Sequence, residues 1–243
     1  NATIPNITKG LLDIVSSHLG LKITPVSFVA YVYSILACND YVEKFWDELT
    51  LPGPRIPITK DPQLYSKAKS LGSWMIWIHT FGERYTTDKA RPKGKIPKGK
   101  IICQIGTSSN PANYPEQYHY DPLKNTLKIG DSGLFINVKA KVWEYSVSGL
   151  HVLKSWLEYR MKSGSGRQLS NLDLIRSNTW NYDAELLEIM WIVEHTIDKQ
   201  QQLCISLNNI LSGPVFLESD FPEPTEAEKN GPVKDGPLFS SKN

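Results

Sequence analysis

A dense group of charged side chains lies at residues 89–101, which read KARPKGKIPKGKI. Five lysines and one arginine stand there among prolines and glycines. The segment cannot bury an apolar face, and its repeated Pro and Gly prevent a stable helix. Ammonium and guanidinium groups on such a segment pair with anions. The sequence therefore predicts either a solvated loop or a loop that binds a negatively charged partner.

The charge of the whole chain is unevenly distributed around this segment. The formal net charge is only +2, yet residues 84–168 hold 15 basic and 6 acidic residues. The rest of the chain holds 12 basic and 19 acidic residues. A basic middle between acidic flanks indicates a polyanion partner on one face, although solvated lysine-rich loops are also common.

Catalytic signatures are missing from the chain. There is no His-Glu-x-x-His, no Cys-x-x-Cys, no phosphate-binding Gly-rich loop and no Gly-x-Ser-x-Gly, so neither a metal site nor a catalytic residue is expected. Asp183 and Glu185 suit the acidic first turn of a helix, where they complement its dipole. The isolated chain is not expected to be an enzyme. The five histidines are scattered: His18, His79, His119, His151 and His195.

The cysteines and the apolar runs indicate the cellular setting. Cys38, Cys103 and Cys204 are odd in number and widely spaced, which predicts reduced thiols in a cytoplasmic protein. No run of about 18 apolar residues exists, so no membrane partner is expected. The start, NATIPNITKG, has no Met and no signal-peptide pattern, and we expect it to lie inside a longer polypeptide.

The first 80 residues and the last third favour helices. Apolar residues recur at helical spacing over 25–37, 40–49 and 62–82, and four prolines at 51–62 predict an extended connector. Further helices are expected at 149–162, near 170–177 and at 183–205.

The middle of the chain favours strands. A buried strand is expected at 101–105 and another at 142–147, while TLKIGDSGLFINV at 126–138 predicts a hairpin around its Gly-Asp-Ser-Gly turn. The predicted fold class is therefore α+β, a helical scaffold with a mostly antiparallel sheet that carries the basic loops, followed by long helices. We expect one structural unit with four parts: an N-terminal helical scaffold (1–85), a β-rich part (86–148), C-terminal helices packing on the scaffold (149–213) and an extended tail (214–243).

Four ordered blocks of the sequence resemble one known family. They read FVAYVYSILACNDYVEKFWDEL (28–49, followed by PRIPI at 54–58), LGSWMIWIHTFGERY (71–85), IGDSGLFINVKAKVWEYSVSGLHVLKSWLEYRMK (129–162) and SNLDLIRSNTWNYDAELLEIMWIVEHTI (170–197). Over about residues 25–205 the chain resembles the C-terminal specificity domain of type ISP restriction-modification enzymes, which join nuclease, translocase, methyltransferase and target recognition in one polypeptide.

The resemblance implies a DNA sequence-recognition module. Adenine N6-methylation and cleavage would belong to upstream domains, and S-adenosylmethionine, ATP and Mg are implied only for those domains, so this chain is expected to hold no cofactor. The implied partners are double-stranded DNA and the upstream methyltransferase domain of the same polypeptide. The alternative is a docking domain that packs on the methyltransferase without contacting DNA. Trp143, Trp156 and Tyr159 in the matching blocks are expected to be core residues.

The basic segment then becomes a candidate for contact with DNA. Its cations suit phosphates, and an arginine, asparagine or glutamine suits base edges. Phosphate candidates are Lys89, Arg91, Lys93, Lys95, Lys98, Lys100, Lys139 and Lys141. For Lys139 and Lys141 an equal alternative is that they are solvated and protect the edge of a strand from pairing with another chain. Base-reading candidates are Arg91, Gln104, Ser108, Ser109, Asn110 and Asn113. A second candidate surface, KSGSGRQ at 162–168, which also suits an ordinary helix C-terminus, supplies Lys162, Ser163, Ser165, Arg167 and Gln168.

Overall fold

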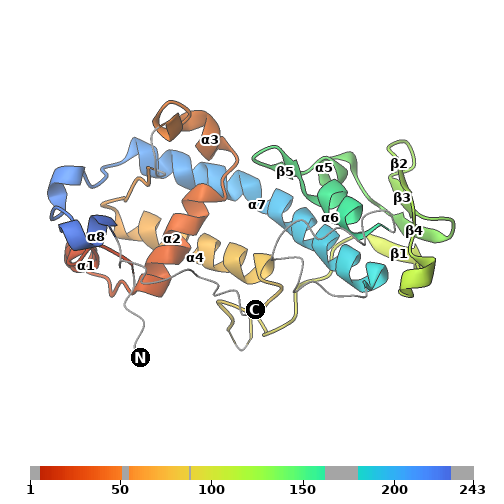
Figure 1. The fold of residues 1–243 in the computed structure, drawn as a ribbon. Helices are drawn as coiled ribbons and strands as arrows, with labels where there is room; N and C mark the ends of the chain where they lie inside the picture. The colour runs from red at the N-terminus through yellow and green to blue at the C-terminus, as the bar shows by residue number, and fades with distance from the viewer. Residues whose placement is uncertain (1–5, 51–54, 88, 162–179, 231–243) are drawn as a thin grey trace, which may run out of the picture. The chain divides into compact units, whose positions relative to one another are not determined.

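The computed structural model describes residues 6–50, 55–87, 89–161 and 180–230 (Figure 1). The chain folds into two compact units. Unit 1 combines residues 1–75 with 201–243, and unit 2 comprises residues 76–200. The two longest helices, α4 (Pro62–His79) and α7 (Leu187–Ser212), each contribute residues to both units.

Unit 1 is helical in the part that the structure describes. The start of α2 is fixed by a capping box, because Thr24 Oγ1 accepts from the Ser27 N–H at 3.2 Å and Ser27 Oγ accepts from the Thr24 N–H at 2.8 Å. Besides its parts of α4 and α7, the unit contains α1 (Leu11–Leu19), α2 (Pro25–Leu36), α3 (Asp40–Lys44), the 3₁₀ turns η1 (Glu48–Thr50) and η5 (Glu218–Asp220), and α8 (Glu226–Asn230).

The helix expected at 40–49 is shorter than predicted. It ends at Lys44, and Phe45 leaves the helical region with φ −116°. Of the apolar stripe that suggested the longer helix, Phe45 and Leu49 pack against the core of unit 1, whereas Val42 and Trp46 are 42% and 67% exposed. Half of the stripe therefore stays substantially exposed, and burial is what stabilises most protein helices.

The core of unit 1 is built around two stacked tyrosines. The rings of Tyr31 on α2 and Tyr65 on α4 lie 4.6 Å apart and nearly parallel. The Tyr31 hydroxyl donates to Pro57 O at 2.7 Å and accepts from the Thr59 N–H at 3.1 Å, so it holds the proline-rich connector in place. Leu203 and other residues of the C-terminal half of α7 complete this core.

Residues 214–220 contact the same connector, at the start of the segment that the sequence predicted as an extended tail. The Phe216 N–H donates to Ile58 O and the Lys60 N–H donates to Pro214 O, both at 2.8 Å. Lys60 Nζ also lies 2.9 Å from Asp220 Oδ2. These contacts join segments more than 150 residues apart in the chain, which composition alone does not predict.

Unit 2 contains a four-stranded antiparallel sheet, drawn in yellow to green in Figure 1. Its strands are β1 (Ile102–Ile105), β2 (Tyr118–Asp121), β3 (Thr126–Ile129) and β4 (Gly133–Ile136), in the order β1-β4-β3-β2. The hairpin expected at 126–138 is confirmed, with Leu127 opposite Phe135. The predicted α+β class is confirmed as well.

The strand expected at 142–147 is wrong over most of its length. Residues Ala140–Trp143 form the short helix α5, and only β5 (Ser146–Val147) pairs with β6 (Leu150–His151). Val142 and Trp143 are both buried in one core. Consecutive residues of a strand point to opposite faces, whereas a helical turn lets both side chains reach the same core.

The core of unit 2 lies between one face of this sheet and the helices. Leu127 and Ile129 of β3 and Phe135 of β4 are fully buried, and the intervening Lys128 is exposed, as a sheet with one covered face requires. The other elements of the unit are the 3₁₀ turn η2 (Pro111–Asn113), α6 (Val152–Arg160) and the π-helical turn η4 (Tyr182–Leu186) that leads into α7. Within the described ranges of both units, no helix is long and apolar enough to cross a membrane.

Candidate nucleic-acid interface

The basic loop, residues 89–101, is held in a defined conformation at both ends. Near its start, the Trp77 indole N–H donates to Pro92 O at 3.2 Å, and the Gly94 N–H donates to Gly82 O at 3.0 Å. Both partners belong to the end of α4 or to the turn that follows it. The segment is therefore a folded loop of unit 2, with its backbone fixed by hydrogen bonds.

The other end of the basic loop is held by α7. Glu194 Oε2 accepts from the backbone N–H groups of Lys100 and Ile101, at 2.9 and 3.3 Å. The Trp191 indole N–H donates to Ile101 O at 2.9 Å. A Cβ on Gly99 would lie 2.1 Å from Glu194 Oε2, so only glycine allows this close approach between loop and helix.

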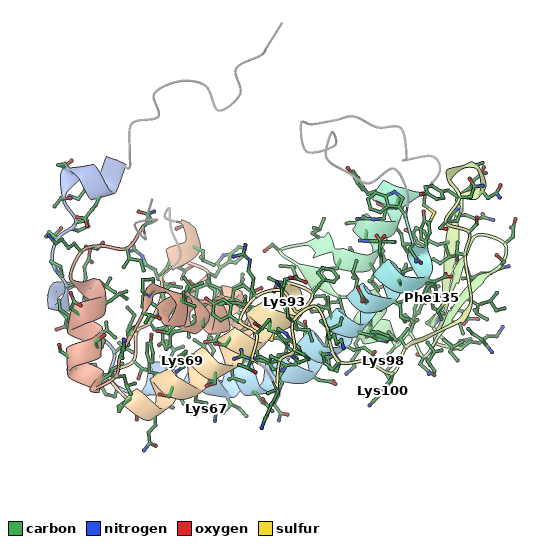
Figure 2. The ribbon with its side chains drawn as sticks, turned by 90° about the horizontal axis from the view of Figure 1, so that it is seen from below. Lys67, Lys69, Lys93, Lys98, Lys100 and Phe135 are labelled. Atoms are coloured by element: carbon green, nitrogen blue, oxygen red, sulfur yellow. The ribbon has the colours of Figure 1, made fainter. Side chains whose placement is uncertain are left out.

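With its backbone held against α4 and α7, the basic loop directs its lysines to solvent. Figure 2 labels Lys93, Lys98 and Lys100 along it. Lys93 Nζ lies 3.9 Å from Glu83 Oε2, a solvent-exposed pair that contributes little to stability. All five lysines of the loop are exposed: Lys89, Lys93, Lys95, Lys98 and Lys100.

Two of these lysines meet two more from the segment after β4. Lys98, Lys100, Lys139 and Lys141 line one cavity of about 160 Å³, the basic cleft, together with Glu194, His195 and Asp198 of α7. Lys141 Nζ lies 3.7 Å from Asp198 Oδ1, with both side chains more than half exposed. Within the described residues, no carboxylate oxygen lies within 4.0 Å of the other three ammonium groups, so their charge is available to an anion.

Strand β1 leads from the basic loop to a polar loop at residues 106–117. Asp183 Oδ1 accepts from the Thr107 N–H at 2.8 Å, and a Cβ on Gly106 would lie 2.5 Å from Asp183 Oδ2. The position of Asp183 in the sequence indicates only a role in the dipole of its own helix. The structure shows that its carboxylate holds this polar loop, as Glu194 holds the basic loop.

The polar loop and the β3–β4 turn enclose a cavity of about 700 Å³, the polar cleft. Thr107 Oγ1 is buried at its edge and has no hydrogen-bond partner among the described residues. Among the described residues, neither lysine nor arginine lines this cleft, in contrast to the basic cleft. The other polar side chains of its lining include Ser108, Asn113, Glu116, Gln117, Asp131 and Ser132.

The structure brings some predicted contact residues together and leaves others apart. Ser108 and Asn113 share the polar cleft, whereas Asn110 Oδ1 accepts from the Ala112 N–H at 3.0 Å and so stabilises its own turn. Gln104 is exposed at a register shift in the edge strand β1, an irregularity that redirects a side chain. Ser109 is exposed on the polar loop.

Arg91 differs from the lysines of the basic loop. It is partly buried, and that burial lowers the pKa of its guanidinium. One terminal guanidinium nitrogen is buried with no hydrogen-bond partner among the described residues, so it can still donate to an added acceptor. The second predicted surface lies outside the described residues: Lys162, Ser163, Ser165, Arg167 and Gln168.

Sequence reasoning missed Glu116, Gln117, Asp131 and Ser132 of the polar cleft. The Gly-Asp-Ser-Gly motif predicts a turn, and its Asp and Ser were the signal in the sequence that this turn can also contribute to a polar site.

In the described part of unit 1, one group of side chains has the spacing of metal ligands, namely Cys38, Asp40 and Cys204.

Comparison with known proteins assigns the fold to one family. The model of the Type ISP C-terminal specificity domain matches residues 1–190. Solved structures with a similar fold include the DrdV–DNA complex seen by cryo-EM (TM-score 0.50, 16% identity, 86% of this chain and 20% of that chain). Another is the ATP-dependent Type ISP restriction-modification enzyme LlaBIII bound to DNA (TM-score 0.50, 16% identity, 81% of this chain and 12% of that chain).

Also similar is a nuclease-deletion mutant of the Type ISP restriction-modification enzyme LlaGI in complex with a DNA substrate mimic (TM-score 0.46, 17% identity, 77% of this chain and 14% of that chain). The chain spans a fifth or less of the length of each of these proteins. No curated protein matches it. The resemblance inferred from the four sequence blocks is confirmed, and the chain belongs to the Type ISP C-terminal specificity domain family.

Proposed function

We propose that this chain is the DNA target-recognition domain of a single-polypeptide restriction-modification enzyme. In this proposal unit 2 binds duplex DNA and positions it for adenine N6-methylation and cleavage by upstream domains of the same polypeptide. The relatives in the solved structures are DNA complexes, which supports DNA as the ligand. The observation that carries the proposal is the basic cleft, where four lysines from two separate segments converge.

The two clefts suit different parts of a duplex. In the basic cleft, lysine ammonium groups neutralise phosphates and release counterions, which gives affinity without regard to sequence. The described lining of the polar cleft carries two carboxylates, Glu116 and Asp131, and these repel phosphates. Its amide, hydroxyl and carboxylate groups instead match the donors and acceptors of base edges.

The chain order links the two functions. Strand β1, whose four residues span about 13 Å, runs between the basic loop and the polar loop. Phosphates held at one end of β1 therefore set the position of the bases that reach the other end. Asn113 and Gln117 would bond adenine, and Asp131 would accept from the amino group of cytosine.

Fluorescence anisotropy with a labelled duplex at several salt concentrations tests this proposal. The variant Lys98→Ala/Lys139→Ala should bind every duplex more weakly, and the slope of log K against log salt should fall by about 0.9 for each lost phosphate contact. The control Lys124→Ala/Lys128→Ala removes the same charge from exposed positions of unit 2 outside both clefts.

Equal losses of affinity in the two double variants would mean that binding depends only on net charge and that the basic cleft does not contact the duplex. Unchanged affinity in both would favour the docking alternative, in which the domain packs on the methyltransferase and its lysines stay solvated.

A further inference from the structure

Unit 1 brings together two cysteines that are far apart in the sequence. Cys38 lies in the short connection between α2 and α3, and Cys204 lies on α7, 166 residues later. Their sulfur atoms are 3.3 Å apart. Cys38 is 2% exposed, whereas Cys204 is partly exposed, so the pair lies at the edge of the unit's core with one side open to solvent.

A carboxylate completes the group. An oxygen of Asp40, the first residue of α3, and the two sulfur atoms all lie within 4.8 Å of one another. Burial, together with the hydrogen bond to Cys204, raises the pKa of Cys38 to about 12.

We propose that Cys38, Asp40 and Cys204 form a binding site for a thiophilic divalent cation of the Zn²⁺ class. Zinc accepts thiolate and carboxylate ligands in a tetrahedral arrangement, and three protein ligands leave one position for water. Asp40 and Cys204 are both partly exposed, which gives that water and the entering ion a path. The ion would connect the α2–α3 connection to α7 within the core of unit 1.

The spacing fits a metal better than a disulfide. Two thiolates at about 2.3 Å from one tetrahedral ion are about 3.8 Å apart, so the observed pair has to widen by only a fraction of an ångström. A disulfide needs about 2.05 Å between the sulfurs, a closure of more than 1 Å between segments packed in one core. Asp40 has no part in a disulfide, whereas a cation offsets the charge of all three groups.

Co²⁺ titration of the reduced 243-residue chain tests the site directly. Tetrahedral thiolate coordination should give charge-transfer absorption in the near ultraviolet and visible d–d bands that saturate at one equivalent and disappear when Zn²⁺ is added. The chain should be reduced with a phosphine, because dithiol reductants bind these metals themselves.

Alkylation of the unsubstituted chain supplies a second measurement. Iodoacetamide under native conditions should modify Cys204 more slowly with Zn²⁺ present than without it. Cys103, which is also partly exposed but belongs to unit 2, should react at the same rate in both cases and serves as the internal control. Peptide mass spectrometry distinguishes the two sites without any variant.

Substitutions then identify the ligands. Cys204→Ser and Asp40→Asn should each weaken Co²⁺ binding by at least about tenfold, and Cys103→Ser should leave it unchanged. Circular dichroism confirms that each variant is folded. Absence of the thiolate bands together with unchanged alkylation would overturn the proposal. Mild oxidation that cross-links Cys38 to Cys204 in a chain that binds no metal would overturn it in favour of a disulfide. None of these outcomes bears on DNA binding by unit 2.

Discussion

The backbone N–H of Lys100 donates a hydrogen bond to Glu194 Oε2 at 2.9 Å, across 94 residues of chain. Thr107, at the other end of β1, donates in the same way to Asp183 Oδ1 at 2.8 Å. The η4–α7 segment thus supplies one carboxylate to each of the two loops that form the clefts. The structure of both clefts depends on these two acidic side chains, and their charge also enters the electrostatics of the surface.

Glu194→Gln separates those two effects. Glutamine keeps a side-chain oxygen that accepts from the Lys100 and Ile101 N–H groups, but it removes a negative charge from the lining of the basic cleft. Duplex affinity at low salt should therefore rise by about 1 kcal/mol, roughly fivefold, and the gain should shrink as salt increases. Anisotropy titrations at two salt concentrations measure the change.

The matched control for this change is Glu188→Gln. Glu188 is exposed on the same helix and does not line the basic cleft. It should change affinity much less than Glu194→Gln does. A folded Glu194→Gln variant whose affinity is unchanged or lower would show that phosphates do not approach this cleft.

Gly99→Ala tests the close approach of the basic loop to α7. The added Cβ would lie 2.1 Å from Glu194 Oε2 and 2.5 Å from Trp191 Cδ1, so these side chains or the loop have to move. Urea denaturation should show a loss of about 1–3 kcal/mol in the free energy of unfolding. Gly213→Ala is the control, because its Cβ meets nothing nearer than 3.4 Å, and it should cost less than about 1 kcal/mol. Equal costs would mean that the loop does not lie against α7.

Gln117→Ala tests base reading in the polar cleft. If the amide bonds a base edge, its loss should reduce discrimination at one base pair by about 1–3 kcal/mol while leaving the salt dependence unchanged. Selection from a randomised duplex pool followed by sequencing measures the preference at each position. Gln63→Ala, which removes an exposed amide from unit 1, should leave the selected sequences unchanged. Uniform weakening of binding to all sequences of the pool would mean that Gln117 contacts the DNA backbone and not a base.

Local patterns predicted the elements whose apolar spacing and turn residues fit a single type of secondary structure. The Gly-Asp-Ser-Gly turn between alternating apolar residues gave the β3–β4 hairpin, and the apolar stripe after Pro62 gave α4. Prediction was wrong at residues 142–147, because Val142 and Trp143 suit either a strand or a helical turn. The helical turn forms because it buries both side chains in one core. That core is a tertiary feature, so the local sequence does not predict it.

The clefts themselves depend on contacts that no short window of sequence contains. The lysines of the basic loop were identifiable by type, but their meeting with Lys139 and Lys141 follows from the β1–β4 pairing. Glu194 and Asp183 lie 94 and 76 residues from the amides that they accept from. The Cys38–Cys204 pair could not be predicted for the same reason, because 166 residues separate the two cysteines and neither belongs to a Cys-x-x-Cys motif.

His79 at the end of α4 is a partly buried histidine in unit 2. Its Nε2 lies 2.8 Å from Thr196 Oγ1, and the Thr196 hydroxyl donates to Ile192 O at 2.7 Å. Because that hydroxyl proton is already used, Nε2 carries the proton and donates to Thr196. Burial lowers the pKa of His79 to about 4, from an ordinary value of 6.5.

This lowered pKa makes the stability of the chain depend on pH in a defined direction. The unfolded chain binds a proton at His79 below about pH 6.5 and the folded chain only below about 4, so acid favours unfolding. The free energy of unfolding should lose about 3 kcal/mol from this residue as the pH falls from 6.5 to 4. Urea denaturation of the parent chain and of His79→Gln isolates the effect, because their difference in stability should shrink with falling pH. His119→Gln, at an exposed position of β2, is the matched control. A pH-independent difference in stability for His79→Gln would mean that the folded chain does not hold this imidazole in the neutral form.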